Sequence, residues 1–303
     1  MHFDRFSIFE NLNFESIMKE RIALLFCCIV LGSTAQTLQS PNKLLTLKTG
    51  VSEKGEPFYE LDIQNKKVIT KSFLGLVLKE TSNLKEGFSV ANVQTFAVDE
   101  TWKPVLGEVR EIRNHYNELK LFLIQPSTQR KMNIVFRLFD EGLAFRYEIP
   151  AQEKLNYFVI SDEVSQFALT ENYKAFWIPG DYDSQEYAYN ETQLSEIDVT
   201  KLDMNNGIGM KGPMAKSRIQ SPVMLKSPSG IYVNIFEAAV VNYPIMHLDV
   251  DTSTFLMQSH LVPNAIGDKA YLQAPSNTPW RTIMVSDDAR KILSSKMTLN
   301  LNE

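Results

Sequence analysis

Short apolar stretches that alternate with polar residues and end at turn residues dominate the chain after residue 40. In the stretch 132–139, the side chains of Ile134, Phe136 and Leu138 alternate with those of Val135, Arg137 and Phe139. This is the period with which a β-strand exposes its two faces. Asp140-Glu141-Gly142 then supplies a turn, and residues 143–149 form the returning arm of a hairpin. By the same pattern we expect further strands at residues 44–49, 58–63, 68–70, 74–78 and 230–236.

Helical signals are scarce by comparison. The clearest is the segment 286–293, where Ser286 can cap the first turn and two aspartates suit the positive end of the helix dipole. No internal repeat or low-complexity linker divides the chain. Many short strands with Gly, Pro and Asn between them favour one large domain. The sequence therefore predicts an all-β fold, a large antiparallel sandwich.

Composition excludes several functional classes. Of the 303 residues, 44% are apolar and 22% are charged, a balance far from that of disordered chains. The net charge is −5 and the sequence pI is about 5.6. Such a chain has no strongly basic surface for nucleic acid or for an anionic membrane.

The first 35 residues differ from the rest and match a secretory signal. Met18-Lys19-Glu20-Arg21 precedes an apolar run at 22–31, and small residues follow at Ser33 and Ala35. The run is too short to span a bilayer, which takes about 20 residues. We expect cleavage after Ala35, a true start at Met18, a mature domain over residues 36–303, and export to the periplasm or the medium. A buried core helix is the alternative interpretation of the run.

Four longer motifs are more specific than these patterns. They are EIRNHYNEL at 111–119, FRLFDEG at 136–142, FWIPGDYDSQEY at 176–187 and NTPWRT at 277–282. In their order and spacing they resemble the N-terminal domain of glycoside hydrolase family 97, whose best-known members are bacterial α-glucosidases. The resemblance extends from about Leu38 to Asn302.

This resemblance implies a super-β-sandwich of the galactose-mutarotase type, followed by a (β/α)₈ barrel. In the family the barrel provides both carboxylates that cleave the glycosidic bond of an α-linked oligosaccharide. The sequence ends at Glu303, before the position at which that barrel would begin. We therefore expect a truncated chain whose partner, the catalytic barrel, is missing. We expect no catalytic residue in the chain and no activity from the chain alone.

One family role falls on a residue of this sequence. The family has a calcium-binding glutamate in the Gln-Glu-Tyr of its longest motif, and Glu186 matches it within Gln185-Glu186-Tyr187. Calcium takes six to eight oxygen ligands, so one carboxylate cannot form the site alone. Asp181 and Asp183 lie close in sequence, but their spacing is not that of a calcium-binding loop. We expect Glu186 to be a metal ligand in the intact enzyme, and both aspartates to be structural.

The remaining candidates favour structural roles. His115, His247 and His260 have no partner at the spacing of metal ligands. Trp102, Trp177 and Trp280 could stack on sugars, but their apolar or proline neighbours favour packing in the core or at a domain interface. The glycine-rich loop at 207–209 lies where the family brings a loop toward the substrate, within a segment, 198–216, that breaks the strand pattern.

Three hypotheses for the function follow. The first is the non-catalytic N-terminal half of an exported α-glycosidase, which packs on the barrel, shapes the sugar pocket and donates Glu186 to calcium. The second is a standalone carbohydrate-binding module. The third is a mutarotase-like enzyme, which would need an acid–base pair in one pocket.

Overall fold

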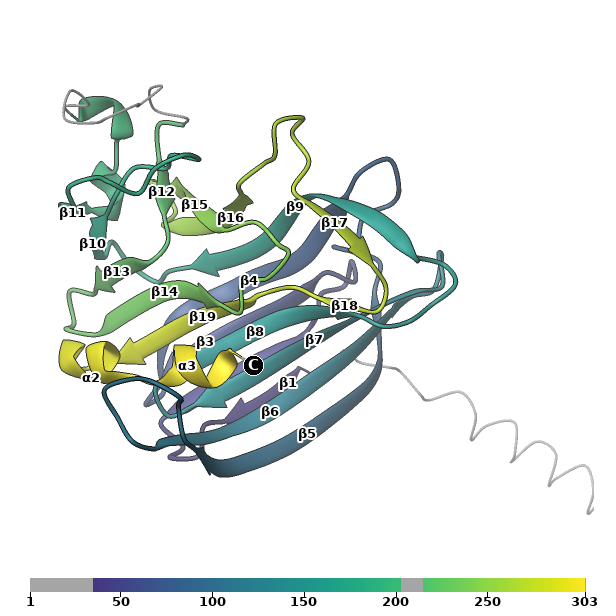
Figure 1. Ribbon diagram of the computed structural model, residues 1–303, viewed down its shortest axis with the longest axis horizontal. Helices are drawn as coiled ribbons and strands as arrows, with labels where there is room; N and C mark the ends of the chain where they lie inside the picture. The colour runs from purple at the N-terminus through teal and green to yellow at the C-terminus, as the bar shows by residue number, and fades with distance from the viewer. Residues whose placement is uncertain (1–34, 203–214, 303) are drawn as a thin grey trace, which may run out of the picture. The chain divides into compact units, whose positions relative to one another are not determined.

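The computed structural model describes residues 35–202 and 215–302, in which nearly every element is a β-strand (Figure 1). The proposed signal segment and the glycine-rich loop at 207–209 lie outside the described residues. Residues 35–303 form one compact unit. Among the described residues, no helix is long and apolar enough to cross a membrane.

The strands of the described residues form two sheets, in which all neighbouring strands are antiparallel. The first has nine strands; eight follow the order β1 (Gln36–Gln39), β2 (Leu45–Val51), β3 (Pro57–Ile63), β4 (Lys66–Leu78), β9 (Tyr157–Ala168), β16 (Leu256–Leu261), β15 (Met246–Asp251) and β12 (Arg218–Gln220), and β17 (Ala270–Gln273) also pairs with β9.

The second sheet has ten strands in the described part of the chain. Nine follow the order β11 (Asn190–Gln193), β10 (Lys174–Trp177), β13 (Val223–Lys226), β14 (Tyr232–Ala238), β19 (Trp280–Ser286), β8 (Gly142–Ile149), β7 (Arg130–Phe139), β6 (Ile112–Gln125) and β5 (Ser89–Trp102), and β18 (Ser276–Asn277) pairs with β8. Two 3₁₀ turns, η1 (Leu194–Glu196) and η2 (Val199–Lys201), follow β11.

The core lies between the two sheets. Ile134, Phe136 and Leu138 of β7 are fully buried there, as the alternation in the sequence predicts. Tyr59 from the first sheet and Phe145 from the second meet with ring centroids 5.2 Å apart. The predicted all-β sandwich is therefore confirmed, and the strands predicted at 132–139 and 143–149 are β7 and β8.

The turn between β7 and β8 depends on a glycine. A Cβ at Gly142 would lie 2.3 Å from the carbonyl oxygen of Ile283 on β19. Any other residue would therefore push β8 and β19 apart at this point. The Asp140-Glu141-Gly142 motif is thus fixed by strand packing as well as by the turn.

Two local predictions were wrong. Residues 68–70 and 74–78 belong to one strand, β4, which pairs with β3 up to Phe73 and with β9 from Leu74 onward. The predicted helix 286–293 is shorter, because Ser286 ends β19 and Asp288 is the N-cap of α2 (Ala289–Ser294). The Asp288 carboxylate accepts the N–H of Arg290, the capping bond that the sequence assigned to Ser286.

A second helix, α3 (Met297–Leu301), was not predicted. With α2 it packs on the outer face of the ten-stranded sheet, where Ile292, Met297 and Leu301 join a second apolar cluster. Trp280 belongs to this cluster and is fully buried. The guanidinium groups of Arg137 and Arg146 lie over its ring at 4.7 and 4.5 Å from the centroid.

An ion-pair network joins the two sheets inside the core. Arg281 of β19 donates to both carboxylate oxygens of Glu163 on β9, at 2.8 and 2.9 Å, and also to Glu237 on β14. Arg281 and Glu163 are fully buried. Burial opposes charge on Glu163, yet the Arg281 guanidinium holds the pKa of that carboxyl below its usual value. The network is charged, and it fixes β19 against β9.

Candidate metal-ligand loop and its support

The longest motif folds as β10 followed by a loop at residues 178–189. Trp177 ends the strand, is buried in the core and donates its Nε1–H to the Thr192 hydroxyl at 3.0 Å. Three residues on, Gly180 lies directly against Arg218 of β12, where a Cβ would be 2.5 Å from Arg218 Cγ. The Gly180 N–H donates to the Arg218 carbonyl oxygen at 2.8 Å. A glycine is therefore required for the loop to lie on this side chain.

Tyr182 holds the loop to the nine-stranded sheet. Its hydroxyl accepts a hydrogen bond from Arg218 Nη1 at 3.0 Å and lies 2.7 Å from His260 Nε2. The Tyr182 and His260 rings are stacked, with an interplanar angle of 8°. Arg218 in turn makes a two-point ion pair with Asp249, at 2.7 and 2.9 Å. The loop is thus fixed through two strands of the sheet.

The histidines of this cluster are neutral at pH 7. Burial lowers the pKa of His260 to about 4, and the positive charge of Arg218 acts in the same direction. His247, its cross-strand neighbour, is only 1% exposed, and its pKa is also lowered to about 4, chiefly by burial. At Nε2 a neutral His260 can accept a hydrogen bond from the Tyr182 hydroxyl, while Arg218 donates a hydrogen bond to the same oxygen.

The tip of the loop is fixed by further hydrogen bonds. The buried Gln220 side chain donates its Nε2–H to the carbonyl oxygens of Pro179 and Ser184, at 2.9 and 2.8 Å. Asp181 accepts the Asp183 N–H at 2.8 Å and the Tyr187 hydroxyl. Burial and the Asp181 carboxylate raise the pKa of Tyr187, so Tyr187 stays a donor. Both carboxylate oxygens of Asp181 therefore accept hydrogen bonds from residues of the same loop.

Glu186 differs from Asp181 in its surroundings. Its backbone N–H donates to the Ser184 hydroxyl at 3.1 Å, but its exposed carboxylate has no hydrogen bond or ion pair with the described residues. A free carboxylate on a fixed loop suits one ligand of a shared calcium ion. No group of three or more His, Cys, Asp or Glu side chains in the described ranges could hold a metal. The other ligands of such an ion would have to come from elsewhere.

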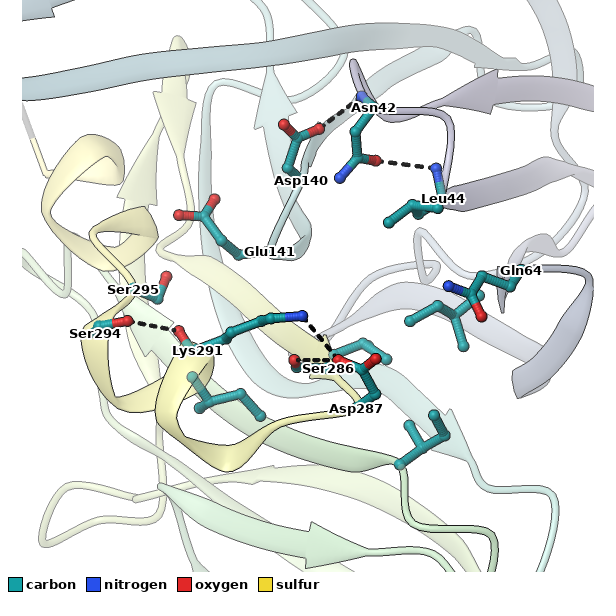
Figure 2. Close-up of a pocket in the computed structure, with 14 residues that line it drawn as sticks. Asn42, Leu44, Gln64, Asp140, Glu141, Ser286, Asp287, Lys291, Ser294 and Ser295 are labelled. Atoms are coloured by element: carbon teal, nitrogen blue, oxygen red, sulfur yellow. Dashed lines mark hydrogen bonds and ion pairs between the residues drawn. The ribbon is translucent and has the colours of Figure 1, made fainter.

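A second candidate is a cavity of about 450 Å³ beside α2 (Figure 2). In Figure 2 Lys291 reaches across it to Asp287, with Nζ 2.9 Å from the carboxylate oxygen. On the opposite wall the Asn42 N–H donates to Asp140 at 2.8 Å. Burial raises the pKa of Glu141, which also lines the cavity. Most of the charged side chains that line the cavity are paired within the chain. We therefore interpret the cavity as the junction between α2 and the neighbouring hairpin turns.

The tryptophans are structural, as expected. Trp177 and Trp280 are buried and offer no ring face to a sugar. Trp102 is half-buried, and its Nε1–H donates to Asn300 of α3 at 2.8 Å. His115 lies half-buried on β6 opposite Asp99 of β5.

Sequence reasoning missed the cluster that supports the loop. It set His247 and His260 aside because their sequence spacing is not that of metal ligands. The two are opposite each other in the β15–β16 hairpin, whose turn lies at residues 252–255. Counting residues outward from that turn along both strands would have shown that the two histidines are cross-strand partners. Nothing local pointed to Arg218, because its contacts with Gly180 and Tyr182 depend on β12 and the 178–189 loop meeting in the fold.

Two facing antiparallel sheets, with one end carrying a fixed loop and a free carboxylate, define a β-sandwich domain. Comparison with known families is specific: the family model "Glycosyl-hydrolase 97 N-terminal" matches residues 38–303. The chain therefore belongs to glycoside hydrolase family 97, as its N-terminal domain.

Individual relatives agree with this assignment. A retaining α-galactosidase of Bacteroides thetaiotaomicron is 24% identical over 93% of this chain and 44% of its own length. The structure of a family 97 enzyme from Pseudoalteromonas sp. strain K8, in complex with panose, is 30% identical, with a TM-score of 0.78 over 88% of this chain and 38% of the enzyme. A β-arabinopyranosidase structure, 22% identical with a TM-score of 0.69 over 83% of this chain and 40% of that enzyme, shares the fold. The chain thus spans less than half the length of these relatives.

Proposed function

We propose that this domain is the non-catalytic N-terminal part of an exported α-glycosidase. In that enzyme it packs on the catalytic domain, borders the sugar pocket through the 178–189 loop and donates Glu186 to a calcium ion. The observation that carries the proposal is the contrast within the loop. Asp181 makes hydrogen bonds within the loop, whereas Glu186 is exposed and has no partner in the described ranges, on a backbone that contacts at Gly180, Tyr182 and Ser184 hold in place.

The relatives support the substrate class. One is an α-galactosidase, and the Pseudoalteromonas structures contain panose in one case and acarbose in another. The chain matches 38–44% of these proteins, so their remaining parts are available to supply the catalytic carboxylates. We infer an α-linked oligosaccharide as substrate of the whole enzyme and no hydrolysis by this domain alone. Export is inferred from the apolar run at 22–31 and the small residues before Gln36.

A domain exchange tests the role of Glu186. Residues 36–303 replace the N-terminal domain of the Pseudoalteromonas enzyme, and folding is checked by circular dichroism and size-exclusion chromatography. We expect the chimera to hydrolyse an aryl α-glucoside and to bind calcium. Glu186→Gln should weaken calcium binding, measured by titration calorimetry, about tenfold or more, because a charged ligand is replaced by a neutral one.

Asp183→Asn is the matched control, because Asp183 is also an exposed acid of the loop but has no proposed metal role. If both variants of a folded chimera bind calcium as the parent does, Glu186 is not a ligand. If residues 36–303 alone hydrolyse the glucoside, and Glu186→Gln abolishes that activity, the domain is an enzyme and the proposed division of labour is wrong.

A further inference from the structure

The outer face of the nine-stranded sheet carries a groove of about 390 Å³. This volume falls in the range of about 300–1,000 Å³ that small-molecule sites occupy. The floor comes from the neighbouring strands β4, β9 and β16, and one wall comes from the segment after β4. We call it the outer groove, and its main lining residues are Phe73, Val77, Lys85, Val164, Gln166 and Gln258.

The floor is partly apolar. Phe73 and Val77 of β4 lie beside Val164 of β9, and all three side chains are half-buried. The wall depends on Gly75, where a Cβ would lie 2.5 Å from Lys85 Cα and 2.8 Å from the Leu84 carbonyl oxygen. The missing side chain lets residues 84–85 lie close against the sheet. The groove is therefore built by the packing of ordered strands and one close backbone contact.

Two amide side chains cross the floor. Gln166 and Gln258 are opposite each other in the register of β9 and β16. Gln166 Oε1 accepts the Phe73 N–H at 3.1 Å, and Gln166 Nε2 donates to Gln258 Oε1 at 3.2 Å. This chain of bonds fixes the orientation of both amides. It leaves both N–H groups of Gln258 without an acceptor among the described residues, available to a ligand.

The charges and the free amide donors of the groove disfavour two ligand classes. Among the lining residues, Glu56, Glu86 and Asp162 contribute carboxylates against the one ammonium group of Lys85, which has no ion pair in the described part of the chain. This excess of negative charge disfavours phosphates and other anions. A wholly apolar ligand would leave the Gln258 donors buried without acceptors, at a cost of about 1–3 kcal/mol. A neutral ligand with many hydroxyl groups meets neither objection.

We propose that the outer groove binds a neutral oligosaccharide. A pyranose ring has an apolar C–H face, which can pack on Phe73 and Val164, and hydroxyl groups that can accept from Gln258 and donate to Asp162. Asp162 lies at the end of the groove that is nearest the 178–189 loop. Its carboxylate is 3.9 Å from Nδ1 of His260, and His260 Nε2 contacts the Tyr182 hydroxyl of that loop. The site requires neither Glu186 nor calcium.

The test is a titration of the full chain with panose, raffinose and cellotriose, followed by calorimetry and by saturation-transfer NMR. We expect millimolar or tighter binding of at least one sugar. Gln258→Ala should weaken that binding about tenfold, the value of one or two hydrogen bonds. Lys85→Ala, at a side chain without ion pairs, should weaken it less, and it provides a second variant if Gln258→Ala does not fold.

Gln94→Ala on β5 is the matched control, since Gln94 is an exposed glutamine on the other sheet. It should bind sugar like the parent, and so should Glu186→Gln. The proposal is overturned if the folded parent binds none of the three sugars at millimolar concentration, or if folded Gln258→Ala and Lys85→Ala variants both bind as the parent does. Sugar binding that Glu186→Gln removes, while Gln258→Ala preserves it, would place the sugar at the loop and overturn the outer groove.

Discussion

The outer faces of the two sheets are built differently, and β19 and β16 illustrate how. All seven residues of β19 are buried, because its inner face meets the core and its outer face meets α2 and α3. In β16, buried residues alternate strictly with half-exposed ones, so only one face is covered. A strand that is buried along its whole length thus marks the face that the chain closes for itself. The alternating strand marks the face on which Gln258 and His260 lie half-buried.

This difference separates stability from recognition. The ten-stranded sheet carries its outer apolar cluster around Trp280, and the polar groups there hold the cluster together. The outer face of the nine-stranded sheet carries the support of the 178–189 loop and the outer groove. Substitutions on the two faces should therefore have different consequences.

The largest loss of stability is expected from the ion-pair network in the core between the two sheets. Arg281→Met would leave the carboxylates of Glu163 and Glu237 buried without a counter-charge, at a cost of about 3–5 kcal/mol in the free energy of unfolding. Urea denaturation measures it. Arg290→Met, which removes a solvent-exposed pair with Asp288, should cost far less, because water screens exposed ion pairs. Similar losses in the two variants would mean that the buried network does not join the sheets.

Trp280→Ala should come next and should act on the ten-stranded face alone. Removing a fully buried indole costs about 3 kcal/mol or more, and it also takes away the packing under α2 and α3. We expect faster proteolysis after residue 286, with no change in the 178–189 loop. Trp102→Ala, at a half-buried ring, is the control and should cost less. Equal exposure of the loop in Trp280→Ala would show that the two faces are coupled.

Acid should weaken the nine-stranded face. In an unfolded chain His247 titrates near 6.5, but in the folded chain its pKa is about 4. Between these values the unfolded state binds a proton that the folded state does not, so stability is full above pH 6.5 and falls as the pH is lowered toward 4. His247→Gln should flatten this part of the curve of unfolding free energy against pH. His115→Gln, on the other sheet, is the matched control, and equal flattening in both would contradict the assignment.

The smallest effect is expected from Tyr182→Phe. The ring stacked on His260 is kept, but Arg218 Nη1 and His260 Nε2 lose the hydroxyl, at a local cost of about 1–2 kcal/mol. Amide hydrogen exchange in residues 180–187 should become faster while global stability changes little. Tyr189→Phe, at an exposed ring of the same segment, should leave exchange as it is. Unchanged exchange in Tyr182→Phe would show that Gln220 and Gly180 fix the loop without it.

The sequence predicted what local patterns determine. The alternation at 132–139 predicted β7, the Asp-Glu-Gly turn predicted the hairpin, and the family motifs identified the domain. The division of β4 into two strands was wrong because a change of pairing partner at Phe73 and Leu74 leaves the strand itself continuous. The cap of α2 was misplaced by two residues because the pairing of β19 with β14 continues through Ser286.

The support of the site could not be predicted in the same way. Arg218 contacts a glycine and a tyrosine almost 40 residues earlier in the chain, and it pairs with Asp249 about 30 residues later. Gly75 similarly gives no sign in sequence that residue 85 will lie against it. Such contacts depend on the order of strands in the sheet, which patterns of a few residues do not determine.

Strand β5 has a consequence for how copies of this chain meet one another. It is the last strand of its sheet, is 14 residues long, and exposes Phe96 and Val90 along a free edge. Such an edge is a template on which another extended chain can add itself. A bulge between Val90 and Asn92 interrupts the ladder, and Glu100 places negative charge near its far end, whereas the neighbouring Asp99 is paired with Arg113. Edge-to-edge pairing of two copies is thus opposed by a break in register at one end of the strand and by the single charge of Glu100 at the other.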